Sequence, residues 1–403
     1  MTVDVRTRSD HDIRSISPGE FFALELPSLL QRTGVLAARA AARLDLGPIT
    51  LRIDGDTYTL RAAASTIEIT RDEAADSTVL VVMSGPTFSN WVQEVRSMLA
   101  LLVTKDAEVE RGDSNVALGW DAVLRAMVDG RPVYEPGSVP LTNLDGSPLD
   151  IGQSFTPDAD DAEMGRFLEQ AGFLMLRGWI DTDAVNTIYQ DINRGLATAE
   201  RDDPHRWWAR LENGGEACVR LKHFCEISAT GKLAAESDMF QRICNLTGDE
   251  FAFPPACIEA LIKPAGVLAG PSEIRWHKDC WQGRHPFFCS GLTIGILLAP
   301  SNEQTGGFRI MAGSHRTNFP AVDRAIDAID LPTRSLYGEP GDLTVHLSCA
   351  MHETVPPQQG ERRLMYGGFS LVDRATGEGV DNRYSIKHAA WSDAVTSAWE
   401  AFA

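Results

Sequence analysis

His277 and Asp279 lie two residues apart in the sequence Ile-Arg-Trp-His-Lys-Asp-Cys-Trp at residues 274–281. In an extended strand, residues i and i+2 point to the same face with Cα atoms about 7 Å apart, so both side chains could bind one metal ion. A third ligand has to come from elsewhere, and a predicted strand at residues 342–346 leads to His352 just beyond its end. Two imidazoles and one carboxylate on one side of a metal leave the opposite side open. This arrangement suits non-haem Fe(II) and its oxygen chemistry.

A cation and a hydroxyl group follow His352 at positions that suit a dianionic cosubstrate. Arg363 lies eleven residues after His352, and Thr354 lies two residues after it. If 2-oxoglutarate chelates Fe(II) beside one aspartate, the charges of the metal ion, the 2-oxoglutarate dianion and the aspartate sum to one negative charge. The distal carboxylate of 2-oxoglutarate therefore needs a cation. An arginine with a neighbouring hydroxyl group provides charge-assisted hydrogen bonds there. We therefore predict that Arg363 and Thr354 bind that carboxylate.

The same residues belong to an ordered set of motifs. The set comprises His-Lys-Asp at 277–279, Leu-Thr-Ile-Gly-Ile-Leu-Leu at 292–298, Gly-Gly-Phe-Arg-Ile-Met-Ala-Gly-Ser-His at 306–315, Gly-Asp-Leu at 341–343, His352 and Arg363. In this order the motifs resemble the phytanoyl-CoA dioxygenase family of Fe(II)/2-oxoglutarate oxygenases, over about residues 155–390. The resemblance implies a double-stranded β-helix, also called a jelly-roll or cupin fold, that uses Fe(II), 2-oxoglutarate and O2.

The resemblance also selects between neighbouring candidates. His346 competes with His352 for the third metal position, but the family spacing to the Gly-Asp-Leu motif and to the arginine favours His352. We interpret His346 as a packed histidine. Strand alternation sends only one of Arg362 and Arg363 inward, and the family spacing selects Arg363.

Three further residues are candidates for the pocket. Lys222 could bind the other carboxylate of 2-oxoglutarate, although a solvated lysine is an equal alternative. Thr293, on the predicted strand after the His-Lys-Asp motif, could line the same pocket. Trp281 faces the same side as Asp279 if the strand continues, and could form a wall of the substrate pocket, although most aromatic residues belong to the core.

The composition bounds the class of protein. At 403 residues, the chain is long enough for two domains that each bury a core. The excess of 56 Asp and Glu over 37 Lys and Arg gives a formal charge of −19. This charge repels phosphate backbones and anionic membranes, so we expect no nucleic-acid partner, although a local basic pocket is not excluded. We find no signal peptide and no apolar run long enough to span a membrane, and we expect a cytoplasmic protein.

The seven cysteines all lie in the second half of the chain and form no Cys-x-x-Cys pair. This pattern indicates neither a disulfide framework nor a zinc ribbon. We expect reduced thiols.

The chain divides into four parts by its patterns. Residues 1–17 are polar and form a flexible N-terminus. Residues 18–135 predict a smaller α+β domain with the order helix, strands, helix, strand, helix, which resembles the sterol-carrier-protein-2-like (SCP2-like) fold. Residues 136–160 have the Pro, Gly, Ser and Asp content of a linker. Residues 161–403 form the oxygenase domain, in which we interpret residues 206–208 as a loop.

The predicted reaction hydroxylates an unactivated C–H bond of a small, hydrophobic organic substrate, with release of succinate and CO2. Family members that halogenate lack the carboxylate ligand, so Asp279 favours oxygenation; desaturation, ring formation and epoxidation stay open. An SCP2-like domain implies a lipid-like substrate, and a secondary metabolite fits equally. That domain could instead serve packing or dimerisation, so a homodimer is also open. The alternatives from other classes are a cupin-type metalloprotein that does not use 2-oxoglutarate and a non-enzymatic lipid carrier.

Overall fold

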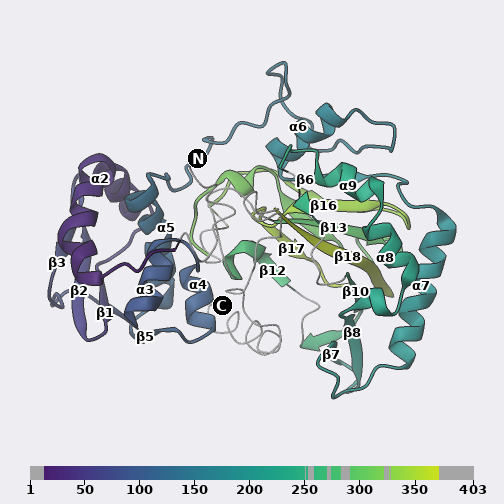
Figure 1. Cartoon of the computed structure of the whole chain (residues 1–403), viewed down its shortest axis with the longest axis horizontal. Helices are drawn as coiled ribbons and strands as arrows, with labels where there is room; N and C mark the ends of the chain where they lie inside the picture. Colours follow the sequence, from purple (N-terminus) through teal and green to yellow (C-terminus); the bar gives the residue numbers. More distant parts are fainter. Residues whose placement is uncertain are drawn as a thin grey trace.

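The computed structural model describes residues 13–249, 251–252, 258–269, 274–282, 291–321, 326 and 328–371. The protein consists of an N-terminal unit whose last helix is α5 (Ser114–Asp129), with the residues up to Tyr134 that directly follow it, and a C-terminal unit whose first helix is α6 (Asp161–Ala171). The two units lie side by side (Figure 1). Within the described ranges, none of the helices is long and apolar enough to cross a membrane.

The N-terminal unit is a mixed five-stranded sheet with helices. The sheet has the order β3-β2-β1-β4-β5, in which β1 and β4 are parallel and the other neighbours are antiparallel. Its strands are β1 (Ile49–Ile53), β2 (Asp56–Ala62), β3 (Ile67–Thr70), β4 (Val79–Met83) and β5 (Ala107–Arg111). Its helices, besides α5, are α1 (Pro18–Glu20), the π-helical turn η3 (Phe21–Glu25), α2 (Leu26–Arg43), α3 (Gly85–Val92) and α4 (Met98–Val103).

Local sequence explains two features of this unit. Asp54 and Gly55 both adopt positive φ, 49° and 95°, which is the backbone of a tight hairpin turn between β1 and β2. The helical stretch after β4 is divided into α3 and α4, because Glu94 adopts a φ of 58° and interrupts the helical backbone. Ser97 then caps α4 with its side chain.

Aromatic side chains fill the core of the N-terminal unit. Phe22 stacks on Tyr58 with ring centroids 4.3 Å apart, and Phe21 meets Phe88 edge to face at 5.5 Å. Trp91 extends the same cluster from α3. The SCP2-like resemblance of this unit stays a prediction.

The stretch expected as a linker, residues 136–160, packs against the C-terminal unit. It forms isolated bridges but none of the named helices or strands of the described chain. Phe155 is buried, its N–H donates to the Met175 carbonyl at 2.9 Å, and its carbonyl accepts from the Arg177 N–H at 2.8 Å. This stretch has the composition of a linker, but it packs against the C-terminal unit instead of standing apart from it.

The C-terminal unit contains two sheets, which confirms the double-stranded β-helix. The larger sheet has the order β11-β7-β8-β10-β18-β13-β16-β6, with β9 also paired to β18. Its strands are β6 (Phe173–Leu176), β7 (Arg206–Leu211), β8 (Glu216–Leu221), β9 (Phe251–Ala252), β10 (Glu259–Pro264), β11 (Val267–Ala269), β13 (Gly291–Leu297), β16 (Leu343–Leu347) and β18 (Glu361–Leu371). The smaller sheet has the order β12-β17-β14-β15, with β12 (Ile274–His277), β17 (His352–Thr354), β14 (Phe308–Met311) and β15 (Thr333–Ser335).

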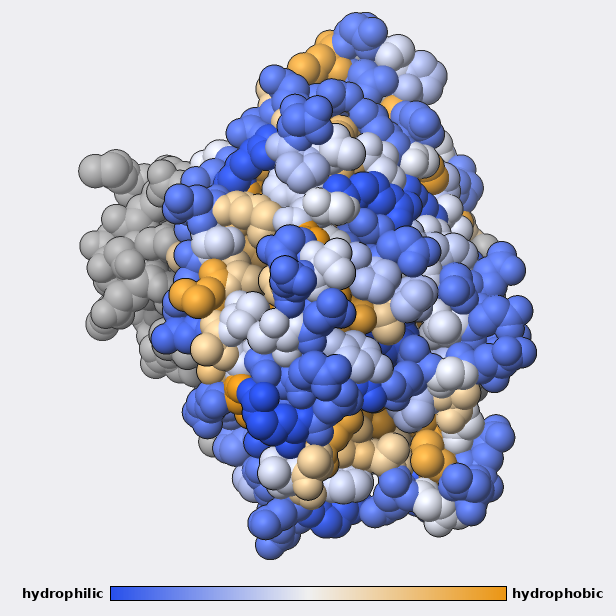
Figure 2. Space-filling model, turned by 90° about the vertical axis from the view of Figure 1, so that its right-hand side faces the viewer, coloured by the Kyte–Doolittle hydropathy of each residue, from blue (hydrophilic) through white to orange (hydrophobic). Residues whose placement is uncertain are grey.

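Helices cover one face of the larger sheet (Figure 1). They are α6, α7 (Thr182–Ala197), α8 (Ala229–Ala235) and α9 (Asp238–Cys244). In α7, the buried residues Val185, Ile188 and Ile192 recur at helical spacing and turn one stripe toward the protein interior. On the outside of this region the surface is mostly hydrophilic, with small separate apolar areas (Figure 2).

The two faces of β18 have different surroundings, and this decides which residues reach the interior. Thr293 of β13 pairs with His346 of β16 and with Gly368 of β18, so these residues share the face opposite the helices, here called the inner face. On the outer face, the Phe369 ring lies 5.9 Å from Phe240 of α9. Even-numbered residues of β18 therefore face inward and odd-numbered residues face the helices.

Two expectations about this unit are wrong. Residues 206–208 begin strand β7 and are not a loop. Cys225 is disulfide-bonded, so the cysteines are not all reduced, although Cys218, Cys244, Cys280 and Cys349 are free.

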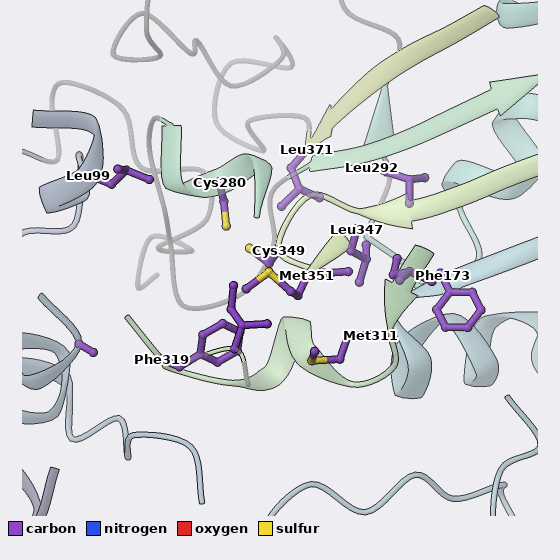
Figure 3. Packing of buried hydrophobic residues seen from close by; sticks show 14 of the residues in the cluster. Leu99, Phe173, Cys280, Leu292, Met311, Phe319, Leu347, Cys349, Met351 and Leu371 are labelled. Carbon is purple, nitrogen blue, oxygen red and sulfur yellow. The ribbon is translucent and has the colours of Figure 1, made fainter. Parts of the chain in front are cut away.

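The two units share one apolar core. Leu99 of α4 lies on one side, and Cys280, Cys349, Met351 and Phe319 of the C-terminal unit lie on the other (Figure 3). All five side chains are buried. The N-terminal unit therefore adjoins the segments that carry the candidate metal ligands.

Candidate active site

His277 and Asp279 come together in a different way from the one expected. Strand β12 ends at His277, and Asp279 begins the short 3-10 helix η5 (Asp279–Gln282), so the pair does not lie on one strand. The turn of the chain nevertheless brings His277 Nε2 to 3.4 Å from Asp279 Oδ1. The spacing predicted the pair, although its strand geometry was wrong.

His352 completes the group from the neighbouring strand. It begins β17 and lies opposite His277 in the β12–β17 ladder, with ring centroids 4.2 Å apart. Its Nε2 lies 3.7 Å from Asp279 Oδ1. One ligand atom from each of the three residues lies within 4.8 Å of the others, which is close enough for a single metal ion.

The second ring nitrogen of His352 orients its imidazole. Nδ1 lies 2.9 Å from the Ala350 carbonyl oxygen, so Nδ1 carries the proton and donates it. Nε2 is then left with a lone pair that faces Asp279. A hydrogen bond of this kind fixes the tautomer in many metal-binding histidines.

Burial and charge set the protonation of the group. Burial and the neighbouring His277 lower the pKa of His352 well below its usual value, so its ring is neutral at physiological pH. Burial would raise the pKa of Asp279, but the surrounding histidines outweigh this effect and hold that pKa well below its usual range. A neutral imidazole and an ionised carboxylate are the forms that bind a metal.

His346 lies in the same cluster but does not complete the three-residue group. Its Nε2 is 3.7 Å from Asp279 Oδ2, and its ring lies 4.6 Å from His352 and 4.9 Å from Phe308. Neither of its buried ring nitrogens has a hydrogen-bond partner within the described part of the chain. His346 thus adjoins the site more closely than expected, and its interpretation as a packed histidine stays a prediction.

The structure does not bring Arg363 to the metal ligands. Arg363 is on the outer face of β18, where its Nη1 donates to Asn193 Oδ1 at 2.6 Å and its guanidinium lies 4.4 Å from the Tyr189 ring centroid. Both partners belong to α7, and Glu361 adds an ion pair. This corrects the choice of Arg363 over its neighbour, because alternation on β18 turns Arg363 toward the helices.

Arg362 takes the inward position. Its side chain is buried on the inner face of β18, opposite Lys263 of β10. Its Nε and Nη1 have no hydrogen-bond partner among the residues that the structure describes. Burial lowers the pKa of Arg362 to about 10, so the group is still a cation at neutral pH. An unpartnered buried cation is costly unless an anion satisfies it.

The other predicted pocket residues take different places. Thr354 is buried and lies two residues after His352 on β17, and Thr293 is on the inner face opposite His346. Lys222 directly follows β8, with its Nζ 5.8 Å from the Trp207 ring centroid, and burial lowers its pKa. Trp281 belongs to η5, so the strand that was to orient it does not persist, and its side chain lies outside the described residues.

Sequence reasoning missed a polar network on the inner face. Arg220 of β8 is held by the Glu259 carboxylate and the Tyr366 hydroxyl, and Tyr366 itself donates to Glu259 Oε2 at 2.7 Å. The guanidinium of Arg220 also lies 4.3 Å from the Trp207 ring centroid. The charge of Asp279 contributes to the pKa shifts of both Arg220 and Tyr366, which places this network near the site. The alternation of side chains along β8 and β18 is the sequence pattern that could have placed Arg220 and Tyr366 on the inner face.

The double-stranded β-helix carries the candidate group of two histidines and one aspartate. Within it, residues 168–363 match the family model described as phytanoyl-CoA dioxygenase (PhyH). This part of the chain is therefore similar to that family, and the class to which the family belongs uses Fe(II) and 2-oxoglutarate. The match includes all three residues of the candidate metal group.

Three solved structures illustrate the similarity in fold. AviO1 from Streptomyces viridochromogenes Tue57 is 17% identical, with 52% of this chain and 95% of that chain covered and a TM-score of 0.44. The non-heme alpha ketoglutarate dependent epimerase SnoN from nogalamycin biosynthesis is 14% identical, with 55% and 91% covered and a TM-score of 0.43. EctD from S. alaskensis with bound Fe is 17% identical, with 64% and 86% covered and a TM-score of 0.44. Similarity at this level assigns no substrate or residue role.

Proposed function

We propose that the protein is an Fe(II)- and 2-oxoglutarate-dependent dioxygenase that hydroxylates a C–H bond of a small organic substrate, with release of succinate and CO2. The observation that carries the proposal is the group of His277, Asp279 and His352, in which both histidines are buried and the ligand atoms lie within 4.8 Å of one another. Two imidazoles and one carboxylate match the donor set of Fe(II) oxygenases. The bound metal, together with 2-oxoglutarate, would activate O2 for this oxidation.

The residues of the chain prepare this site before any ligand binds. The Ala350 carbonyl holds the His352 ring so that Nε2 faces the metal position. Asp279 stays ionised and supplies a negative charge. The protein thus contributes orientation and a fixed charge, while the metal and cosubstrate carry the oxidation.

Arg362, rather than Arg363, is our candidate for the distal carboxylate of 2-oxoglutarate. Its buried guanidinium faces inward, keeps its charge at neutral pH and has unpaired N–H groups among the described residues. A carboxylate would accept two hydrogen bonds from such a fork. Thr354, Thr293 and Lys222 stay candidates for further polar contacts with the cosubstrate.

The substrate and the setting of the protein stay predictions. The inner wall near the site is aromatic at Trp207 and polar at Arg220, Glu259 and Tyr366. A purely hydrophobic substrate would leave this polar wall unused, so we propose a small organic molecule without restricting it to lipids. The homodimer, the cytoplasmic location and the binding of lipid by the N-terminal unit are likewise proposals.

Anaerobic titration with Fe(II) and then 2-oxoglutarate tests the proposal. We expect the weak visible charge-transfer band of the Fe(II)–2-oxoglutarate chelate in the wild type and in His346→Ala, but not in His352→Ala. The matched pair separates the proposed ligand from its packed neighbour. Bound iron without the band would contradict the use of 2-oxoglutarate and favour a cupin-type metalloprotein.

A further inference from the structure

Lys278 lies between the two proposed ligands His277 and Asp279, yet its side chain turns away from the metal position. Only 2% of it is exposed. Its Nζ donates to the Ser314 carbonyl at 2.7 Å and to the Thr317 carbonyl at 3.0 Å, and lies 4.5 Å from the Phe319 ring centroid. A buried ammonium with these acceptors holds its own backbone in place, because moving it would leave a desolvated charge.

The acceptors of Lys278 belong to one segment, residues 314–319, here called the bridge segment. This segment also contacts the chain that carries the third proposed ligand. The Ser314 hydroxyl donates to the Met311 carbonyl at 2.6 Å and accepts from the Met351 N–H at 2.7 Å. Met351 directly precedes His352. The bridge segment therefore holds both ligand-bearing stretches.

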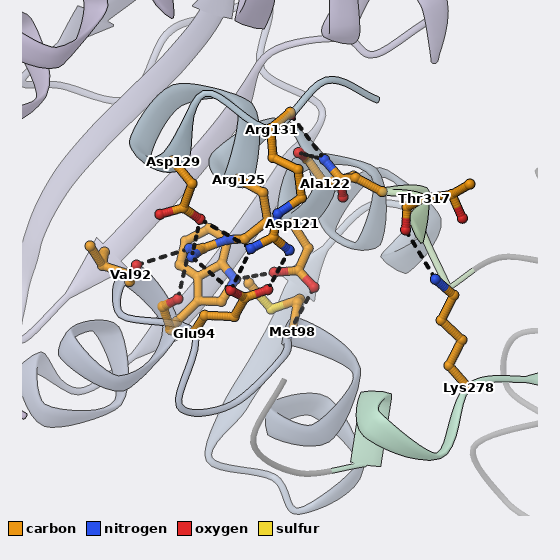
Figure 4. Close-up of polar contacts among 12 residues, drawn as sticks. Val92, Glu94, Met98, Asp121, Ala122, Arg125, Asp129, Arg131, Lys278 and Thr317 are labelled. Atoms are coloured by element: carbon orange, nitrogen blue, oxygen red, sulfur yellow. Dashed lines mark hydrogen bonds and ion pairs between the residues drawn. The ribbon is translucent and has the colours of Figure 1, made fainter. Parts of the chain in front are cut away.

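The same segment is bonded to the N-terminal unit through Asn318, which is buried. Its side-chain amide donates to the carbonyls of Ala122 at 2.9 Å and Arg131 at 3.3 Å, and its backbone carbonyl accepts from the Tyr134 N–H at 2.8 Å. Figure 4 shows the polar contacts that run from Arg131 to Lys278.

The contacts on the N-terminal side are themselves fixed. Arg131 is bound by both carboxylate oxygens of Glu94, at 2.7 Å and 2.8 Å. Arg125 donates to the carbonyls of Trp91 and Val92, at 3.0 Å and 2.9 Å. Such a buried and hydrogen-bonded cluster is rigid, so it can serve as an anchor.

We propose that Lys278 is a positioning residue, and that the N-terminal unit acts through Asn318, the bridge segment and Lys278 to fix the geometry of His277, Asp279 and His352. The inference rests on the proposed metal site but not on the identity of the substrate. It assigns to the N-terminal unit a role in forming the metal centre.

Fe(II) affinity of the full-length protein, measured anaerobically by competition with a chromophoric chelator, tests this inference. Lys278→Met keeps the length of the side chain and removes the ammonium, and we expect it to weaken Fe(II) binding by about 10–100-fold, as loss of an outer-shell partner does. The charge-transfer band with 2-oxoglutarate should also shift or broaden. Lys232→Met, at a half-exposed lysine of α8, is the matched control and should behave as the wild type.

Asn318→Ala tests the link to the N-terminal unit without touching the ligand stretch. We expect weaker Fe(II) binding and the same change in the band, to a smaller extent than in Lys278→Met. Wild-type affinity and band in Lys278→Met would overturn the proposal. An unchanged Asn318→Ala beside a weakened Lys278→Met would overturn the role of the N-terminal unit.

Two further outcomes, a Lys278→Met variant that does not fold and a wild type that binds no Fe(II), can be told apart from failure of the positioning role. If Lys278→Met does not fold, as judged by circular dichroism, the affinity and band of Asn318→Ala decide the question. If the wild type itself binds no Fe(II), the proposed function fails, and the positioning role fails with it. A wild type that binds Fe(II) beside unaffected variants would sink the positioning role alone.

Discussion

At the scale of single residues, a shift of one position decides which arginine reaches the site. Arg362 and Arg363 are adjacent, both are buried, and β18 turns them to opposite faces. Their environments differ in kind. Arg363 has partners on α7, whereas the Nε and Nη1 groups of Arg362 lack partners among the described residues.

The two arginines therefore predict opposite results when each is replaced by glutamine. Arg362→Gln should weaken 2-oxoglutarate binding at least tenfold, because the distal carboxylate loses a charge-assisted pair. Arg363→Gln should leave that affinity near the wild-type value and lower the thermal stability, since its contacts with α7 are lost. Isothermal titration with 2-oxoglutarate in the presence of Fe(II) measures the first effect, and a melting curve measures the second. Weakened binding only in Arg363→Gln would restore the choice made from the sequence.

The sequence could predict the ligand set at this scale but not the arginine. The types and order of His277, Asp279 and His352 were sufficient to predict that these three residues come together, and their role as metal ligands stays a prediction. Choosing between Arg362 and Arg363 required the register of β18 against β10 and β13, and a single residue of loop length reverses that register.

At the scale of elements, sequence patterns located most strands and helices and missed how some of them end. Strand β12 stops at His277, and α3 stops before Glu94 with its positive φ. No residue of proline or glycine marks either end. Both ends depend on tertiary packing, which a pattern of apolar residues does not contain.

The close contact between Gly172, at the end of α6, and His315 leads to a prediction about how the stability of the fold depends on pH. Gly172 ends α6 with a φ of +83°, and a Cβ added there would lie 2.4 Å from Nδ1 of His315. His315 Nε2 also lies 2.9 Å from the Glu169 carbonyl oxygen. Burial in this tight place lowers the pKa of His315 to about 3.

This lowered pKa should make the fold less stable in acid. The unfolded chain protonates this histidine near pH 6.5, but the folded protein does not until about pH 3, so stability falls as the pH drops through that window. Urea unfolding at several pH values should show a smaller loss in His315→Gln than in the wild type, because glutamine takes up no proton. Equal losses in the two proteins would show that His315 contributes nothing and that the carboxylates account for the acid sensitivity.

At the scale of the whole molecule, the two units are tied by hydrogen bonds as well as by apolar contact. The bonds of Asn318 cross between the units, and so does the bond from the Tyr134 hydroxyl to Asp330. Leu99 and Phe319 belong to one continuous core. Sequence patterns separated the two units but could not predict this interface, because its polar contacts are formed largely by backbone groups.

We therefore expect the full chain to unfold in one calorimetric transition. Fe(II) with 2-oxoglutarate should move that whole transition to higher temperature, by a stabilisation of about 2.7 kcal/mol when the ligand is at 100 times its Kd. Differential scanning calorimetry with and without the ligands checks this. Two separate transitions, with only one of them shifted, would mean that the units unfold independently.

The pairing of β6 with β16 also has a consequence for how the protein is made. β6 is the first strand of the C-terminal unit. Among the named strands of the described chain it pairs with β16 alone, which lies near the end of that part of the chain, while its other edge meets Phe155 in an isolated bridge. During synthesis, the edge of β6 that pairs with β16 therefore stays unpaired until most of the protein has left the ribosome. Such late, long-range closure is slow and leaves an exposed edge that can join other chains. Slow synthesis at low temperature, with chaperones present, should thus favour active protein over aggregate.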